Sequence, residues 1–118
     1  MFKPTVMNHK ELEKSKVYIT NQIVEYIPNS VGSKTILEKV TGNISALSFD
    51  DKEGLSEKTS PFGAFAQIIE GKAEIIIDGA SYFMKEGECI IIPAHTSHSI
   101  KGNKRFKMIV TIIKSGYE

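Results

Sequence analysis

The sequence predicts an all-β domain on three grounds. Short apolar runs rich in β-branched and aromatic residues recur along the chain, and turn residues separate them at intervals of about 8–12 positions. Hardly any segment has the apolar period of about 3.6 residues that marks an amphipathic helix. Asp78-Gly79 lies between two such runs and indicates a tight hairpin, because a type I′ turn needs positive φ at both central positions. Together these features are typical of a β-sandwich or barrel.

Length and composition limit the classes of function that the sequence supports. A chain of 118 residues is long enough for one domain with its own core. Its 15 basic and 14 acidic residues leave a formal charge of +1, which offers no footprint for nucleic acid or an anionic membrane. No apolar run approaches the roughly 18 residues of a membrane span, and the N-terminal residues lack the apolar segment of a signal peptide. The single cysteine, Cys89, excludes an internal disulfide, so we expect a cytoplasmic protein.

The N-terminal half is expected to contain an extension and two pairs of strands. Residues 1–15 are polar and form the extension, with one helical turn at residues 8–14, and a single domain spans residues 16–118. Residues 16–27 are rich in β-branched and aromatic side chains and are expected to form strands. Residues 33–40 and 44–49 are expected to pair as a hairpin.

The C-terminal half is expected to begin with a surface connection over the polar residues 50–60, followed by a strand over residues 62–70. Three apolar runs between Gly71 and Pro93 predict an antiparallel meander, because each run is closed by a turn signal. The meander leads into a loop that carries His95 and His98. A last strand is expected over residues 106–113.

Gly87, Pro93 and His98 have the spacing of the second signature motif of the cupins, and residues 55–61 followed by an apolar strand occupy the place of the first. The chain therefore resembles a small single-domain cupin over about residues 35–113. This resemblance implies a double-stranded β-helix, the jelly-roll barrel. It also implies a homodimer, in which residues 16–27 could be exchanged between the two copies.

The resemblance implies a metal site of two histidines and a glutamate from the first motif and one histidine from the second. Lys58, Ser60 and Ala64 fall at or near the first three positions, so His98 alone matches. One imidazole cannot hold a transition metal, which takes three or four N, O or S ligands. We therefore predict no cofactor. The alternative is a site rebuilt from His98, His95 and Glu57 that would hold Zn, Fe, Mn or Ni.

The expected ligand pocket consists of six residues: His98, Lys58, Ser60, Ala64, Ala66 and His95. Ala64 and Ala66 lie two apart on one strand, so they face the same side and leave room if that side is the interior. Lys58 is either an exposed rim lysine or a cation in the barrel mouth that attracts an anionic group. His98 is either a hydrogen-bonded interior histidine, a ligand contact or a metal ligand. Cys89 is expected to be buried and inert.

Three functions remain open from the sequence. The favoured one is a barrel that binds an unknown small molecule through His98 without a metal. The second is a metal-dependent enzyme of the dioxygenase or isomerase type with a site rebuilt around His98. The third is a structural or regulatory dimer whose pocket is vestigial. Whether the protein is an enzyme is left open, and a binding role is favoured.

Overall fold

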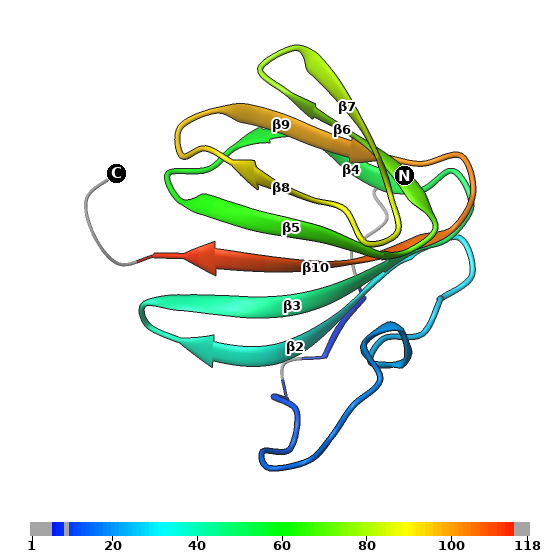
Figure 1. The fold of residues 1–118 in the computed structure, drawn as a ribbon, viewed down its shortest axis with the longest axis vertical. Helices are drawn as coiled ribbons and strands as arrows, with labels where there is room; N and C mark the ends of the chain where they lie inside the picture. The colour runs from blue at the N-terminus through cyan, green and yellow to red at the C-terminus, as the bar shows by residue number, and fades with distance from the viewer. Residues whose placement is uncertain (1–5, 9, 115–118) are drawn as a thin grey trace.

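The structure is a computed structural model that describes residues 6–8 and 10–114, and within them the chain is almost entirely β (Figure 1). The strands are β1 (Val6–Asn8), β2 (Val31–Lys39), β3 (Gly42–Phe49), β4 (Gly54–Thr59), β5 (Gly63–Glu70), β6 (Lys72–Ile77), β7 (Ala80–Lys85), β8 (Cys89–Ile92), β9 (Ser97–Lys101) and β10 (Phe106–Ile113). One turn of 3₁₀ helix, η1 (Thr20–Gln22), precedes β2. The prediction of an all-β fold is confirmed.

Two sheets enclose the core. The six-stranded sheet has the order β1-β2-β3-β10-β5-β8, and the four-stranded sheet has the order β4-β9-β6-β7. Every neighbouring pair is antiparallel except β1 and β2, which are parallel. The two sheets face each other in the predicted jelly-roll arrangement (Figure 1). No helix in the described ranges is long and apolar enough to cross a membrane.

Two of the hairpins predicted from local turn signals are confirmed. Asp78 and Gly79 both have positive φ, at 50° and 82°, and they join β6 to β7 with Ile77 opposite Ala80. The expected hairpin in residues 33–49 is also present as β2 and β3. The last strand, β10, has the predicted bounds.

Two expectations, the helical turn over residues 8–14 and the strands over residues 16–27, were wrong. Residues 10–14 form no helical turn, and Asn8 ends β1 opposite Lys34. Residues 16–27 contain η1 but no strand. This segment lies along the outer face of the large sheet, where Val24 is buried in a small cluster. Its apolar side chains pack against the sheet, and its backbone does not pair with any described strand.

Two side chains of the large sheet donate hydrogen bonds to backbone carbonyl groups of this segment. The Ser48 hydroxyl donates to the carbonyl of Glu25 at 2.8 Å, and the Lys107 ammonium donates to the carbonyl of Asn21 at 2.6 Å. The segment is therefore held by side-chain hydrogen bonds rather than by a β-ladder.

Three expectations for the C-terminal half need correction. Residues 50–60 are not only a connection, because they contain β4. His98 is not in a loop but in β9. The third run of the expected meander, β8, does not pair with β7 but crosses to β5 in the other sheet. Turn residues specify a reversal of the chain, but they do not specify which sheet the next strand joins.

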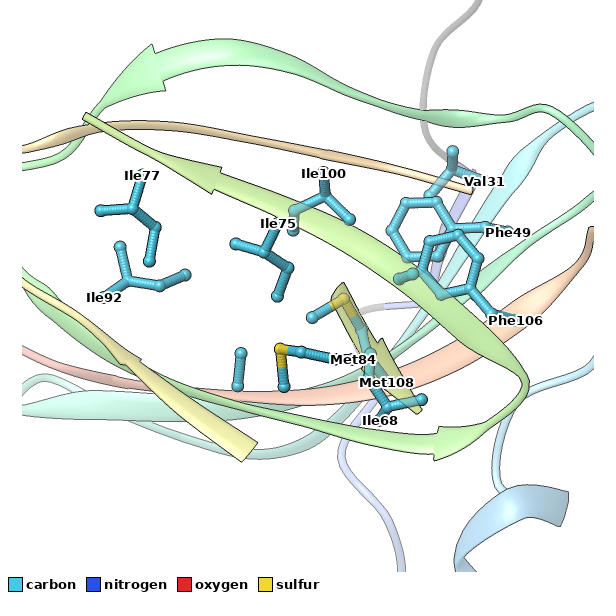
Figure 2. Close-up of a cluster of buried hydrophobic side chains, with 12 residues drawn as sticks. Val31, Phe49, Ile68, Ile75, Ile77, Met84, Ile92, Ile100, Phe106 and Met108 are labelled. Atoms are coloured by element: carbon cyan, nitrogen blue, oxygen red, sulfur yellow. The ribbon is translucent and has the colours of Figure 1, made fainter. Parts of the chain in front are cut away.

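The barrel is plugged at one end, which we call the closed end. The rings of Phe49 and Phe106 stack there with centroids 4.3 Å apart and planes 7° from parallel. Both side chains are fully buried, and Val31 packs with them. Figure 2 shows the stacked rings at one end of the core and Ile77 and Ile92 at the other. The opposite end of the barrel, where Lys58 and His98 lie, we call the mouth.

Candidate functional site

A cavity of about 390 Å³ lies between the two sheets and reaches the mouth. Its apolar lining comes from both sheets and includes Leu47, Leu55, Ile92, Ile100 and Val110. Its volume is far above the roughly 30 Å³ that one water occupies and lies at the lower end of the range for small-molecule sites. The interior can therefore hold a small organic molecule.

Lys58 and His98 face each other across neighbouring strands in the wall of this cavity. The register of β4 and β9 pairs Leu55 with Ile100 and then Lys58 with His98. That step takes three residues on β4 but two on β9, so a β-bulge lies between them. A regular strand would have placed Glu57 opposite His98, because side chains alternate between faces. The bulge therefore puts a cation, rather than a carboxylate, in the wall.

Both groups have hydrogen-bonding capacity to spare. Among the described residues, no carboxylate forms an ion pair with the Lys58 ammonium. The Nδ1 atom of His98 lies 3.4 Å from the carbonyl oxygen of Thr96, a long contact that leaves Nε2 without a protein partner within the described part of the chain. Each side chain is thus available to a bound molecule.

The structure places the other predicted pocket residues in different surroundings. Ser60 and Ala64 line the cavity. Ala66 also points inward, but it is fully buried in the core beside the cavity. His95 is exposed on a turn with φ of 61° and does not line the cavity. Its backbone N–H donates to the carbonyl of Ser60 at 2.7 Å. Cys89 is exposed rather than buried, because alternation along β8 turns it outward.

The described residues form no cluster that fits a resident transition metal. Across residues 6–8 and 10–114, no three His, Cys, Asp or Glu side chains come together as a metal would require. His98 lines the cavity, whereas His95 is on an exposed turn and Glu57 is exposed on β4.

The sequence did not reveal the polar residues of β2 and β3. Ser33, Thr35 and Ser45 line the cavity, with Glu38 and Asn43 nearer the mouth. Alternation along β2 predicts that Ser33 and Thr35 share a face, which is the one available signal. Which face of β2 lies in the interior is determined only by the packing of the two sheets.

A second depression, of about 700 Å³, is more open and lies near the closed end at the bases of β6 and β7. Most of its charged side chains are exposed, and several already have partners. Lys101 lies 3.7 Å from Glu74, and the Glu88 carboxylate accepts the N–H of Lys85 at 2.9 Å. Although larger, it is a groove between surface charges, and the enclosed cavity is the better candidate site.

A cluster of charged and polar groups fastens the outer segment at the closed end. The Asp50 carboxylate accepts the N–H of Asn29 at 2.7 Å and a guanidinium N–H of Arg105 at 2.8 Å. These bonds lower the pKa of Asp50 to about 2, with the backbone bond contributing most. The Tyr26 hydroxyl donates to Glu70 at 2.5 Å, and burial together with this bond raises the pKa of Tyr26. The cluster is explained by its structural role.

Comparisons with known proteins agree with this architecture. The family model described as Cupin domain matches residues 53–112 of the 118. A conserved protein of unknown function from Streptococcus pyogenes has a similar structure, with a TM-score of 0.84, 28% identity and coverage of 91% of this chain and 94% of that one. A cupin superfamily protein from Desulfitobacterium hafniense gives a TM-score of 0.83, 27% identity and coverage of 90% and 97%. A search of the curated proteins finds none that matches.

Proposed function

Because this chain belongs to the family of cupin domains, we propose that it is a small-molecule-binding barrel whose ligand presents an acidic group to Lys58 and His98. The observation that carries the proposal is the cavity of about 390 Å³ in which these two side chains are cross-strand neighbours. A lysine ammonium beside an imidazole attracts a carboxylate or another small anion. The apolar lining deeper in the cavity provides the remaining contact area.

The acidic group is favoured over a neutral polar group because the Lys58 ammonium has no counter-ion among the described residues. The ammonium is at the exposed mouth, where water solvates it in the absence of a ligand. A ligand anion that enters the cavity leaves bulk water and gains the partner that the protein does not supply. Lys58 would then contribute more to binding than to folding.

A thermal-shift measurement tests the proposal. The protein is titrated with a panel of small carboxylates that includes benzoate, cyclohexanecarboxylate, gluconate and quinate. Mass action predicts that a ligand at a hundred times its Kd stabilises the fold by about 2.7 kcal/mol, which raises Tm. No shift with any member of the panel would contradict the proposal.

Matched variants assign any shift to the two side chains. His98→Ala and Lys58→Gln should lose most of the shift. His95→Asn is the control histidine, because asparagine tolerates the positive φ of this exposed turn. Lys104→Gln controls for the loss of one exposed positive charge. A His98→Ala variant that keeps the full ligand-induced shift would show that His98 is not the contact.

The vestigial-pocket alternative is less well supported, because a cavity of this volume is not filled by side chains. The metal-dependent enzyme is tested separately by plasma mass spectrometry for Fe, Zn, Mn, Ni and Cu on protein purified without chelator or affinity metal. We expect well below one equivalent of each. A stoichiometric metal would mean that His98 has ligand partners beyond those described, and the enzyme would then become the favoured function.

We extend the proposal to assembly and location. Phe65 and Ile91 are cross-strand neighbours on the outer face of the large sheet, with exposed fractions of 38% and 71%, which supports burial of this face between two copies. Light scattering at micromolar concentration should give twice the mass of one chain. A single exposed cysteine suits a reducing compartment, and we propose a cytoplasmic protein.

A further inference from the structure

One wall of the cavity carries a column of hydroxyl groups that the proposed acid contact does not use. The antiparallel register of β2 and β3 places Thr35 directly opposite Ser45. Ser33 lies one inward position further from the mouth on β2, opposite Leu47. All three hydroxyl residues line the cavity. Their side chains therefore form one continuous polar surface inside an otherwise apolar interior.

These hydroxyls have no hydrogen-bond partner among the residues that the structure describes. Ser33 and Thr35 are only 8% and 5% exposed, yet no side-chain hydrogen bond joins them or Ser45 to another described residue. No buried side-chain nitrogen or oxygen within the described part of the chain is both sealed from solvent and unpartnered, so these hydroxyls open onto the cavity. A hydroxyl removed from bulk water needs a hydrogen-bond partner. That partner must occupy the cavity.

Ser48 provides an internal contrast. It is on β3 as Ser45 is, but an odd number of positions away, so it faces the outside of the barrel. Its hydroxyl donates to the carbonyl of Glu25 at 2.8 Å. The buried hydroxyl of Ser48 thus has a partner in the protein, whereas the cavity-facing hydroxyls have none within the described ranges.

The charges at the mouth orient a ligand relative to this wall. Glu38 pairs with Asn43 in the row nearer the mouth, so the hydroxyl wall ends in a carboxylate. Lys58 belongs to the other sheet. An anionic group is repelled from the side of Glu38 and attracted to the side of Lys58. The rest of the ligand then faces Thr35 and Ser45.

We infer that the ligand is a small hydroxylated carboxylate, with its acid group at Lys58 and His98 and its hydroxyl groups on the wall formed by Ser33, Thr35 and Ser45. The inference rests on the proposed acid contact and adds the substrate class. Serine and threonine hydroxyls both donate and accept, so they match ligand hydroxyls in either role. A site built to bind a hydroxyl discriminates strongly against an analogue that lacks it.

Isothermal titration of the full chain with two matched pairs of acids tests this inference. Quinate and cyclohexanecarboxylate share a six-membered carbon ring and a carboxylate, and gluconate and hexanoate share a six-carbon chain. Two or more added hydrogen bonds predict that the hydroxylated member of at least one pair binds about tenfold tighter or more. If the plain acid binds as tightly in both pairs, the inference is overturned while acid binding stands. If none of the four acids binds, both the inference and the proposed function are contradicted.

Isosteric variants then place the hydroxyl contacts. Thr35→Val and Ser45→Ala should each weaken binding of the hydroxylated acid about fivefold and leave cyclohexanecarboxylate unchanged. Thr111→Val is the matched control, because Thr111 is on β10 opposite Ile44 and Phe65, outside the cavity. Urea unfolding confirms that each variant is folded. Equal losses for both acids, or an equal loss in Thr111→Val, would overturn the inference.

Discussion

The two ends of the barrel are built from the same strands but differ in what fills them. At the closed end β3 and β10 contribute Phe49 and Phe106, which stack and are fully buried. Towards the mouth, the inward-facing residues of β3 include Ser45 and Asn43. Large apolar side chains fill the interior in one half, and small polar ones leave it open in the other. The residues that stabilise the core and the residues proposed to bind a ligand therefore lie at opposite ends of the barrel, and substitutions at the two ends should have different consequences.

The largest effect is expected for Phe106→Ala at the closed end. Removing a fully buried ring that stacks on Phe49 should lower the free energy of unfolding by about 3–5 kcal/mol, because the cavity left behind adds to the lost burial. Urea denaturation measures the change. Phe83→Ala is the control, since Phe83 is 79% exposed and should change stability by less than about 0.5 kcal/mol. Equal effects would contradict the assignment of stability to the closed end.

Gly→Ala substitutions at two glycines with nearly the same positive φ compare how tightly the surroundings pack at the two ends. Gly71, at the closed end, and Gly79, in the β6–β7 turn, have φ of 79° and 82°. A Cβ at residue 71 would lie 2.7 Å from the carbonyl oxygen of Arg105, but one at residue 79 would meet nothing within 4 Å. Gly79→Ala should cost about 1–2 kcal/mol through φ alone. Gly71→Ala should cost about 1–3 kcal/mol more through overpacking, measured by urea unfolding. Equal costs would exclude the close approach.

A smaller effect, confined to acid pH, is expected from Asp50. Its pKa in the folded protein is about 2, against an ordinary value of 3.8, so its bonds to Asn29 and Arg105 stabilise the fold above pH 3.8. This stability is lost as the pH falls from about 4 to about 2. Asp50→Asn should therefore be less stable than the parent at pH 7, and the gap should close in acid. Glu86→Gln controls for the loss of one exposed carboxylate, and a gap that persists at pH 2 would contradict the account.

The smallest effect is expected for Thr35→Val in the absence of ligand. Because the Thr35 hydroxyl has no protein partner among the described residues, its loss should change the free energy of unfolding by less than about 0.5 kcal/mol. Ser48→Ala removes the hydroxyl that donates to Glu25 and should cost about 1 kcal/mol. Thermal and urea unfolding of both variants make the comparison. A larger loss in Thr35→Val than in Ser48→Ala would mean that the hydroxyl wall is structural.

Sequence patterns predicted the fold well wherever the signal was local. Asp78-Gly79 predicted the β6–β7 hairpin because the turn itself requires positive φ, and the mostly apolar segment Phe106–Ile113 predicted the bounds of β10. β4 was missed because it is polar, and its residues from Ser56 to Thr59 are exposed. Residues 16–27 were wrongly predicted to form strands, because a segment that packs on a sheet and a strand within a sheet both favour apolar side chains.

The site was harder to predict because it depends on register. His98 was placed in a loop, yet its membership of β9 sets it opposite Lys58. One extra residue in β4 places Lys58 rather than Glu57 opposite His98. No local sequence pattern predicts that bulge. The hydroxyls of β2 and β3 become a wall only when two sheets close over them. Such contacts join residues far apart in the chain.

The central claim is that small acids bind at the mouth, beside Lys58 and His98, and not at the closed end. The most direct test is an NMR titration with quinate and, in parallel, cyclohexanecarboxylate, following the His98 ring and the methyl groups of Ile92, Ile112, Met84 and Met108. Ile92 and Ile112 line the cavity, and the two methionines are in the core outside its lining. We predict that the His98 and isoleucine signals shift and saturate together while the methionine signals stay in place. Shifts confined to Met84, which lines the outer depression, would contradict the claim, as would no shift at His98.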